Sequence, residues 1–421
     1  MKNILVLSYY FYPDLSAGSF RNTAIVKELS AQLGSEGIIH VITTQPNRYS
    51  TFRDKAAEHE VWGSNVKIHR ISVPSHYNGF RDQVNSFRVY FSAARALMKG
   101  KKMDMVYASS SKLFTAYLGK VLASKMGCKL YLDIRDIFVE TMVDVLKHRP
   151  FFKHGMLKFI ELIVERPTFR KAVHINLVSK GFESYFQKLT KSPLTYYPNG
   201  IDDEFIGLSA NSINETSPKI ITYAGNIGEG QGLEKIIPQC AKALGPDFIF
   251  KVVGDGGTRR LLEEVIKKEG LTNVEIIKPV KREELVELYK SSHFLFLHLN
   301  DYKAFERVLP SKIFEYGASN LPMIAGVAGY AKEFVTANIS NCFVFDPCDH
   351  EALTKWLRTY DYKLLERKKF INEFKRQAIS VALVSSILSY LQPFAHPSIS
   401  IVPAPKSLGK RLKHSFYSYF M

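Results

Sequence analysis

Residues 219–233 read KIITYAGNIGEGQGL, an apolar run that leads into four glycines within eight residues. The run 219–223 predicts a strand that is buried on both faces. The glycines let the backbone turn tightly and approach a ligand closely, although a plain glycine-rich connector is the alternative. In an open parallel sheet, ligands bind beyond the carboxyl ends of the strands. This turn is therefore the first candidate for a binding site.

Apolar runs that predict strands alternate with helical patterns on both sides of this segment. The expected strands are 2–8, 38–43, 66–71, 105–108, 129–133 and 175–179 in the first half, and 219–223, 248–253, 274–277, 294–297, 323–324 and 342–345 in the second. Strands that are apolar on both faces and separated by helices form parallel sheets covered on both sides. The predicted fold class is therefore α/β, with two doubly wound, Rossmann-like domains facing each other across a cleft. The boundary is expected at Tyr197-Pro198-Asn199-Gly200, because Pro and Asn-Gly end regular structure.

Composition excludes several classes of protein. The chain has 421 residues, of which 46% are hydrophobic, and this is a globular profile with room for two domains. Its four cysteines form no Cys-x-x-Cys or Cys/His pattern, so neither a zinc site nor a disulfide framework is expected. The net charge of +17 favours polyanionic partners such as phosphates, nucleic acid or an anionic membrane. No run of ~20 mostly apolar residues predicts a transmembrane helix, and the apolar start of the chain lacks a signal-peptide cleavage site.

A second glycine-rich turn follows the expected strand 248–253. It contains Gly254 and Gly256 and leads into a helix. The free amides of the turn and the positive end of the helix dipole would stabilise a diphosphate. The alternative is that the turn only caps the helix.

The most informative segment is 305–318, which reads FERVLPSKIFEYGA. Pro310 and Ser311 suit the start of a helix, and Lys312 and Glu315 then share one helical face. A lysine near a helix N-terminus is electrostatically disfavoured unless an anion neutralises it, and a donor phosphate would supply that anion. The carboxylate one turn later would accept hydrogen bonds from two ribose hydroxyls. An ordinary exposed Lys–Glu pair is the alternative.

Together with Pro198-Asn199-Gly200-Ile201-Asp202 and Phe205, these segments resemble the large retaining family 4 of glycosyltransferases, which has two Rossmann-like domains in the GT-B arrangement. The resemblance extends from the first strand to about residue 392. The turn Gly225-Asn226-Ile227-Gly228 and the segment 310–315 are similar to a branch that transfers N-acetylated amino and deoxyamino sugars in bacterial O-antigen and capsule synthesis.

The resemblance implies a role for each part of the chain. Residues 1–198 would form the acceptor-side domain, joined by a C-terminal helix at 371–392. Residues 199–370 would bind the nucleotide sugar, and residues 393–421 would form a basic, aromatic tail. The implied reaction moves a sugar, with retention of anomeric configuration, from a nucleoside-diphosphate donor such as a UDP-sugar to a polyprenyl-diphosphate-linked saccharide. It implies no metal and no other cofactor.

Donor binding is assigned to residues that match the family's motifs. They are Gly18, Gly225, Asn226, Gly228, Gln231, Gly254, Gly256, Glu306, Ser311 and Glu315. Lys312 is the expected catalytic cation, because fixed positive groups aimed at the departing diphosphate would supply most of the acceleration. Two features depart from the family pattern. Arg307 stands eight residues before Glu315, where many members carry a glutamate. Asn226 and Gln231 stand where an Arg and Lys pair is usual.

The acceptor is expected near two segments of the first domain. Residues 13–19, PDLSAGS, follow the first strand and would border the distal phosphate of the donor. Asp133-Ile134-Arg135-Asp136 closes a strand and resembles an Asp-x-Arg-Asp element of the same branch. Asp136 and Arg135 are therefore assigned to the catalytic site, where they would orient the acceptor. A structural Asp–Arg pair is the alternative.

Basic residues beside aromatic ones predict a membrane-facing surface. They are Arg81, Arg88, Arg95 and Lys102, at a spacing of seven, and Lys153 in a second basic segment. Such a surface suits an anionic bilayer, and a solvated basic face is the alternative. The expected location is the cytoplasm, peripheral on the inner face of the cell membrane.

Other functions remain open at this point. A nucleotide-sugar epimerase could use the same two-domain scaffold, and a catalytically inactive scaffold would fit the altered glutamate pair. The charge also allows a non-enzymatic protein that binds nucleic acid or a membrane. Nucleic acid is not the expected partner, because the sequence has no helix-turn-helix, zinc-finger or RNA-binding signature.

Overall fold

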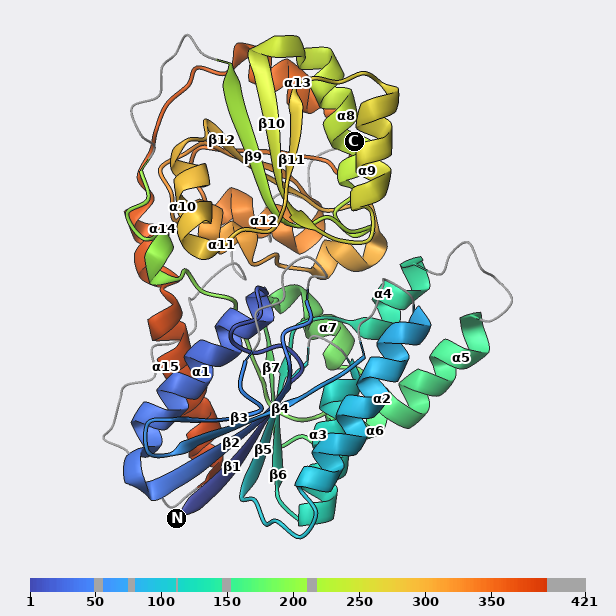
Figure 1. Ribbon diagram of the computed structural model, residues 1–421, viewed down its shortest axis with the longest axis vertical. Helices are drawn as coiled ribbons and strands as arrows, with labels where there is room; N and C mark the ends of the chain where they lie inside the picture. The colour runs from blue at the N-terminus through green and yellow to red at the C-terminus, as the bar shows by residue number, and fades with distance from the viewer. Residues whose placement is uncertain (49–55, 75–79, 111–112, 146–152, 210–217, 392–421) are drawn as a thin grey trace, which may run out of the picture.

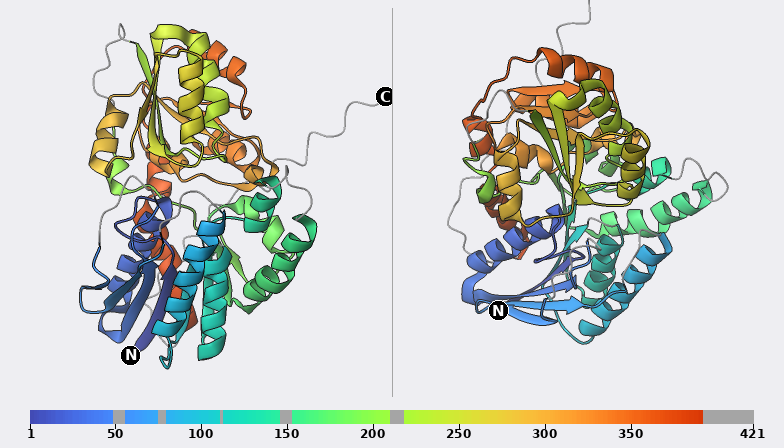
Figure 2. Two further views of the ribbon diagram at one scale, coloured as in Figure 1. Left: turned by 45° about the vertical axis from the view of Figure 1, so that its right-hand side comes forward. Right: turned by 45° about the horizontal axis from the view of Figure 1, so that its top comes forward.

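The computed structural model describes residues 1–48, 56–74, 80–110, 113–145, 153–209 and 218–391. Within these residues the chain forms two domains, each with a central sheet between layers of helices (Figure 1). The domains are stacked along the long axis of the molecule, and both views in Figure 2 show them as separate units. The predicted fold class is confirmed.

The first domain is built on an eight-stranded sheet. In spatial order its strands are β3 (His59–Trp62), β4 (Val66–Ile71), β2 (Gly37–Thr44), β1 (Lys2–Ser8), β5 (Met105–Ser110), β6 (Lys129–Ile134), β7 (His174–Leu177) and β8 (Leu194–Thr195). Only the β3–β4 pair is antiparallel among these strands. The sequence prediction misses the two edge strands, β3 and the two-residue β8. The residues of β3 are alternately exposed and half-buried.

The second domain is built on a six-stranded sheet in which every described pair is parallel. Its spatial order is β11 (Val274–Ile277), β10 (Phe248–Asp255), β9 (Lys219–Asn226), β12 (Phe294–His298), β13 (Met323–Gly326) and β14 (Cys342–Phe345). All six of these strands lie where the sequence predicts them, within a few residues at their ends.

Helices cover both faces of both sheets. In the first domain they are α1 (Ala17–Leu33), α2 (Phe80–Leu97), α3 (Leu113–Met126), α4 (Phe138–Val145), α5 (Lys153–Ile160), α6 (Arg166–Lys171) and α7 (Glu183–Phe186). In the second they are α8 (Leu233–Leu244), α9 (Arg259–Lys268), α10 (Arg282–Lys290), α11 (Lys312–Gly317), α12 (Gly329–Asn338) and α13 (His350–Thr359), followed by α14 (Lys368–Glu373) and α15 (Arg376–Leu388). Short 3-10 turns and one π-helical turn, Glu161–Glu165, link some of them.

Each domain has two hydrophobic cores, one on each face of its sheet. Residues of both sheet faces are therefore buried, and the strands β5 and β13 have no exposed position at all. This explains why apolar runs without alternation predicted the strands correctly. In the described part of the chain, no helix has the length and hydrophobicity needed to cross a membrane.

The expected C-terminal helix is broken where the chain returns to the first domain. The backbone N–H of Ile201 donates to Phe374 O at 2.7 Å, and the N–H of Arg376 donates to Ile201 O at 2.8 Å. A Cβ atom on Gly200 would lie 2.5 Å from Arg376 Cα, so only glycine allows this approach. The two connections between the domains, near Ile201 and near Phe374–Arg376, therefore run side by side. The hydrogen bonds between them form where the helix is broken between α14 and α15.

Beyond this break, α15 packs on the first domain against α1, as Figure 1 shows. Leu383 and Val384 share a core with Ile25 and Val26 of α1. The side chain of Gln377 also donates to a carboxylate oxygen of Glu28 at 2.9 Å. The residues after Leu391, which include the predicted tail 393–421, lie outside the described part of the chain.

Candidate functional site

A cavity of about 330 Å³ lies between the two domains, at the carboxyl ends of their strands. In the first sheet the strand order reverses at β1, and in the second it reverses at β9. Ligands of open α/β sheets bind at such switch points. The first domain lines the cavity with Leu15, Ser16, Ala17, Phe20 and Arg48. From the second domain the lining includes Gly225, Asn226, Gln231, Gly254, Arg282, Ser311, Lys312 and Glu315.

Two glycines allow the second domain's wall to form. Gly225 is the last residue but one of β9, and Gly254 holds the same place in the neighbouring strand β10. Both have a φ of 149°. A Cβ atom on Gly254 would lie 1.8 Å from Gly225 O, and one on Gly225 would lie 2.3 Å from Lys312 Nζ. No side chain fits at either position. The two glycine turns and Lys312, which are far apart in sequence, therefore make one continuous surface.

Lys312 is the first residue of α11, and its Nζ lies 5.7 Å from the centroid of the Tyr223 ring. Burial lowers the pKa of this ammonium, the negative charge of Glu315 opposes that effect, and Arg282 adds to it. An anion bound in the cavity would restore the charged form, since opposite charge nearby favours ionisation. The predicted pairing of Lys312 and Glu315 on one face of a helix is present.

Asn226 and Gln231 hold the glycine turn in shape. The amide nitrogen of Asn226 donates to Gln231 Oε1 at 2.7 Å. The backbone oxygen of Gln231 lies 2.6 Å from His298 Nδ1, and His298 Nε2 accepts the N–H of Cys348 at 2.9 Å. His298 must therefore carry its proton on Nδ1. Burial lowers the pKa of this histidine to about 4, which keeps the ring neutral and the turn supported.

The glycines Gly18, Gly228 and Gly256 lie behind the cavity surface. A Cβ atom would meet Asn226 Nδ2 at 2.4 Å from Gly228 and the backbone oxygen of Ile227 at 2.4 Å from Gly256. These two positions permit close packing under the turn and do not line the cavity themselves.

Glu306 and Arg307 are not among the described residues that line the cavity. The carboxylate of Glu306 pairs with Lys303 at 2.7 Å. The guanidinium of Arg307 points to the first domain, where its Nε lies 3.1 Å from Glu140 Oε2 and its Nη1 donates to Ser184 Oγ at 2.6 Å. In this arrangement Arg307 joins the two domains, and the carboxylate of Glu306 does not line the cavity.

Neither of the two assigned acceptor residues, Arg135 and Asp136, is among the described residues that line the cavity. A Cβ atom on Gly18 would lie 2.0 Å from Arg135 Nη1, so this guanidinium packs against the start of α1. Burial lowers the pKa of Arg135 to about 10, and its buried Nε has no hydrogen-bond partner among the described residues. Asp136 is exposed, and its Oδ1 accepts the N–H of Ile137 at 2.9 Å.

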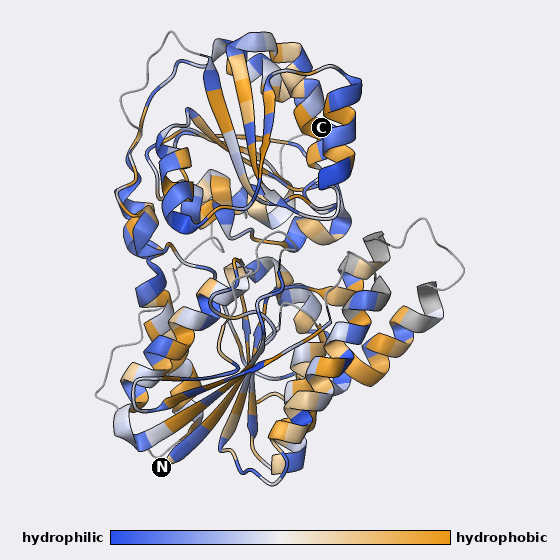
Figure 3. Ribbon diagram, viewed as in Figure 1, coloured by the Kyte–Doolittle hydropathy of each residue, from blue (hydrophilic) through white to orange (hydrophobic). Residues whose placement is uncertain are grey.

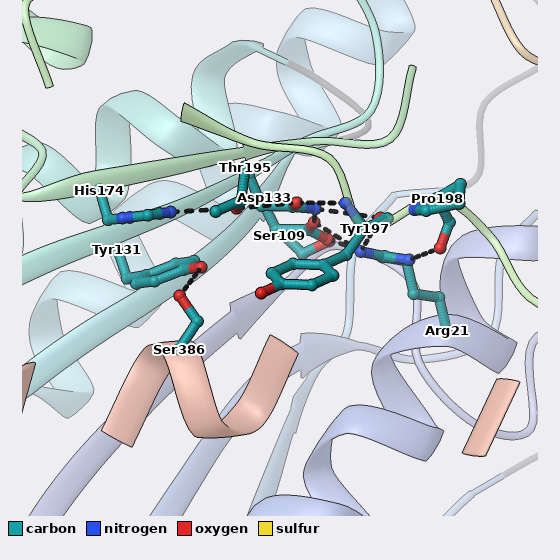
Figure 4. Close-up of polar contacts among 10 residues, drawn as sticks. Arg21, Ser109, Tyr131, Asp133, His174, Thr195, Tyr197, Pro198 and Ser386 are labelled. Atoms are coloured by element: carbon teal, nitrogen blue, oxygen red, sulfur yellow. Dashed lines mark hydrogen bonds and ion pairs between the residues drawn. The ribbon is translucent and has the colours of Figure 1, made fainter. Parts of the chain in front are cut away.

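A buried ion pair does involve the Asp-x-Arg-Asp element, but its partner is not Arg135. Asp133 accepts hydrogen bonds from Arg21 Nε at 3.0 Å and from Arg21 Nη2 at 2.9 Å (Figure 4). Burial alone would raise the pKa of Asp133, but the charge and hydrogen bonds of Arg21 hold it below its usual value. Arg21 also donates to the backbone oxygens of Tyr197 at 2.9 Å and Pro198 at 2.6 Å. This pair therefore fixes the first connection between the domains to the first sheet.

The sequence analysis misses two arginines of the cavity. Arg48 follows β2, and its Nη2 donates to Asn226 Oδ1 of the second domain at 3.0 Å. Arg282 begins α10, and its Cζ lies 3.7 Å from the ring centroid of Phe20 in the first domain. Ion pairs at 2.5 Å join Arg282 to Asp202 and to Glu204. Neither arginine belongs to a local sequence motif. The position of Arg48 shortly after an expected strand is the one feature of the sequence that could have pointed to the cavity.

The turn before Phe205 also has a structural role. Asp202 pairs with Arg376 as well as with Arg282. Burial would raise the pKa of this carboxyl, but the two guanidinium groups lower it. Asp202 thus holds the cavity residue Arg282 and the second connection between the domains at one point.

The expected membrane-facing surface is partly described. Arg88 and Arg95 are exposed on α2, whereas the aromatic residues Phe87 and Tyr90 beside them are buried in the core. Arg81 lies in α2 and Lys153 in α5, but their side chains are outside the described part of the structure.

Exposed hydrophobic residues gather elsewhere in the first domain. Phe159 at the end of α5 is 62% exposed, and Leu162 and Ile163 in the following turn are 45% and 51% exposed. Hydrophobic colouring is visible along α5 in Figure 3, at the outer edge of the domain. Their spacing of three and four residues puts these three side chains on one helical face. The exposed residues Lys158 and Arg170 flank them in sequence.

Within the described residues, no three His, Cys, Asp or Glu side chains converge in a way that could hold a metal ion.

Comparison with known proteins identifies the second domain. Residues 208–379 match the family model for glycosyl transferases group 1. Over 381 residues the chain is 25% identical to a protein of Escherichia coli K12 that is named as a colanic acid biosynthesis glycosyl transferase, WcaI. That alignment covers 84% of this chain and 91% of WcaI.

Solved structures share the fold of the whole described chain. Sucrose-phosphate synthase from Thermosynechococcus elongatus has a TM-score of 0.71 at 14% identity and covers 92% of this chain and 99% of its own. HepE of Anabaena, solved with UDP-glucose, has a TM-score of 0.63 at 14% identity, with coverage of 92% and 100%. WaaG, a glycosyltransferase involved in lipopolysaccharide biosynthesis, has a TM-score of 0.60 at 16% identity, with coverage of 92% and 95%. The two-domain architecture is therefore the GT-B fold, and residues 208–379 form a glycosyl transferases group 1 domain.

Proposed function

We propose that this protein is a retaining glycosyltransferase of family 4 that moves an N-acetylated amino or deoxyamino sugar from a UDP-sugar to a lipid-linked saccharide during assembly of a bacterial surface polysaccharide. The observation that carries the proposal is the interdomain cavity, where Lys312, two glycine turns and Glu315 form one wall. The group 1 domain supplies these residues. The names of WcaI and WaaG support a polysaccharide or lipopolysaccharide product, and the UDP-glucose complex of HepE supports the donor class.

The chemistry follows from the charge that develops when the sugar leaves. Breaking the bond between the sugar and the diphosphate leaves negative charge on the nucleotide and an oxocarbenium-like sugar. Lys312 Nζ and the amides of the glycine turns would stabilise that negative charge in a site already organised to receive it. Glu315, one turn further along the same wall, would accept hydrogen bonds from the ribose.

Retention follows if the acceptor attacks from the face that the diphosphate leaves. A phosphate oxygen of the donor would then take the proton of the acceptor hydroxyl. No protein carboxylate is needed as a base in this step, which agrees with the position of Glu306 outside the cavity lining. Arg135, which lies against Gly18 at the start of α1, would attract the phosphate-bearing acceptor to the first domain.

We also propose that the first domain docks on an anionic membrane, with the protein peripheral on its cytoplasmic face. The exposed residues Phe159, Leu162 and Ile163 would enter the interface, and exposed basic residues such as Arg88 and Arg95 would meet the lipid headgroups. Hydrophobic burial and electrostatic attraction together determine the strength of such binding. The docked enzyme could then reach a lipid-linked acceptor while the lipid of that acceptor stays in the bilayer.

The activity is tested by incubating the purified protein with a panel of UDP-sugars, with and without a polyprenyl-diphosphate-linked saccharide. Release of UDP that depends on the acceptor, with an α- or β-linkage matching that of the donor, is the expected result. Isomerised UDP-sugar without acceptor would instead indicate an epimerase. If no sugar nucleotide is turned over but duplex DNA or RNA is bound, the proposal is wrong.

Membrane docking is tested by replacing Phe159 and Ile163 with Asp in one variant. Sedimentation with phosphatidylglycerol vesicles should weaken about tenfold or more, because two apolar side chains no longer leave water. Leu261→Asp is the matched control, since Leu261 is 47% exposed on the second domain. Equal binding of wild type and the Phe159/Ile163 variant would show that this surface does not dock.

A further inference from the structure

Arg48 is the one described residue of the first domain that reaches across the cavity with a positive charge. It lines the cavity together with Lys312 and Arg282 of the second domain. Its Nη2 donates to the neutral amide oxygen of Asn226 at 3.0 Å, and its Cζ lies 5.8 Å from the ring centroid of Tyr10. The guanidinium is therefore held at the boundary of the two domains, beside the glycine turn.

The backbone of Arg48 is fixed by a buried carboxylate. Asp14 accepts the N–H of Arg48 at 3.0 Å and the N–H of Asn47 at 3.2 Å. The side chain of Asn47 donates in turn to Thr44 Oγ1 and to Gln45 O, each at 2.7 Å. These bonds fix the backbone of Asn47 and Arg48 at the edge of the cavity.

Each positive charge of the cavity has neighbours that can accept hydrogen bonds or pair with it. Arg282 is engaged by the carboxylates of Asp202 and Glu204. Lys312 faces Glu315 on its own helix. Burial raises the pKa of the Asp14 carboxyl, and Arg48 lies close enough for its charge to oppose that effect. Arg48 also donates to the amide oxygen of Asn226. An amide is a weaker acceptor for a guanidinium than a phosphate oxygen. An anionic ligand at the glycine turn would therefore compete well with Asn226 for this donor.

We propose that Arg48 binds the diphosphate of the sugar nucleotide, exchanging the amide oxygen of Asn226 for a phosphate oxygen. The inference rests on the proposed function, since it assumes a nucleoside diphosphate in the cavity. Binding then draws one residue of the first domain onto a ligand seated on the second. Arg48 thereby couples donor binding to the relative position of the domains, and it supplies positive charge to a turn whose own side chains, Asn226 and Gln231, are neutral.

The test compares the dissociation constants of UDP and uridine, measured by isothermal titration calorimetry with displacement for the weaker ligand. Arg48→Gln removes the charge but keeps an N–H donor for Asn226. It should weaken UDP binding roughly tenfold to a hundredfold and leave uridine binding within about twofold of wild type. Arg48→Lys, which keeps the charge, should retain more UDP affinity than Arg48→Gln.

A third variant distinguishes phosphate binding by Arg48 from a purely structural role of this residue, and a fourth serves as a control. Asn226→Ala removes the hydrogen bond between the domains but leaves the guanidinium, so it should lose less UDP affinity than Arg48→Gln. Arg260→Ala is the control, because the Arg260 side chain is 89% exposed on α9, away from the cavity lining. Thermal unfolding of each variant shows whether the fold is intact.

Failure of this inference is distinct from failure of the proposed function. If the wild type binds UDP and Arg48→Gln binds it equally well, or loses UDP and uridine affinity by the same factor, Arg48 does not bind the diphosphate although the transferase proposal stands. If the wild type binds none of UDP, GDP, ADP and TDP, both are overturned.

Discussion

The two walls of the cavity are assembled in different ways. On the second domain, Gly225 and Gly254 lie at the carboxyl ends of their strands and Lys312 at the start of α11, at positions that local motifs mark. On the first domain, Phe20 and Arg48 reach the cavity from a helix and a loop that carry no shared motif. The second wall is backbone packed against backbone, whereas the first wall consists of long side chains held by other side chains. The first wall should therefore tolerate sequence change more readily than the second.

The comparison predicts the largest loss of activity for Lys312→Ala. Turnover should fall by about two to three orders of magnitude, because a fixed cation facing the departing diphosphate is removed. The kinetic constants for sugar transfer measure the effect. The control is Lys268→Ala, an exposed lysine on α9, which should turn over like the wild type. A Lys312→Ala enzyme with near-normal turnover would remove Lys312 from its assigned role.

The next largest effect is a difference in stability between two glycine substitutions, one in each wall. Gly254→Ala places a Cβ atom 1.8 Å from the backbone oxygen of Gly225, at a φ of 149°, and backbone cannot move aside. The expected loss in the free energy of unfolding is about 2–4 kcal/mol. Gly18→Ala meets only the end of the Arg135 side chain, which can rotate away, so a loss below about 1 kcal/mol is expected.

Urea denaturation of both glycine variants measures these losses. Equal losses would show that the first wall is packed as rigidly as the second, and the contrast between the walls would be wrong.

The smallest expected effect is a pH dependence centred on His298, behind the second wall. Its folded pKa of about 4 lies below the ordinary value of 6.5, so the unfolded chain binds more protons between these limits. The resulting stability is fully present above pH 6.5 and is lost as the pH falls toward 4. Between pH 7 and pH 5 this histidine should account for about 2 kcal/mol. His298→Asn should remove this part of the pH-dependent change in the free energy of unfolding, as urea denaturation at the two pH values would show.

His174 of the first domain is the matched comparison, because burial also lowers its pKa to about 4. His174→Asn should reduce the pH dependence of stability to a similar degree. UDP binding at pH 7 should weaken only in His298→Asn, since His298 supports Gln231 in the cavity and His174 bonds to Tyr390 and Thr195 instead. Equal UDP binding by the two variants would show that His298 does not support the second wall.

The sequence by itself determined the sheets. Mainly apolar runs predicted β1, β4, β11 and β14 with their observed bounds. The run is apolar throughout in β14, whereas Lys67 in β4 and Glu275 in β11 are exposed positions within strands whose other residues are buried or half-buried. Strands covered on both faces favour such runs. The sequence also placed Lys312 and Glu315 on one helix, since that relation depends only on local helical geometry. Edge strand β3 was missed because its polar, half-exposed residues lack this signal.

Tertiary structure decided which side chains meet. In the folded chain Arg307 pairs with Glu140 and lies outside the cavity lining. Asp133 pairs with Arg21 and not with Arg135. Arg48 donates a hydrogen bond to Asn226. The partners in these contacts are more than a hundred residues apart, and a side chain's partner depends on how two domains and their loops are packed. Local periodicity carries no information about that packing, so charge pairing and the first wall of the cavity emerge only when the chain is folded.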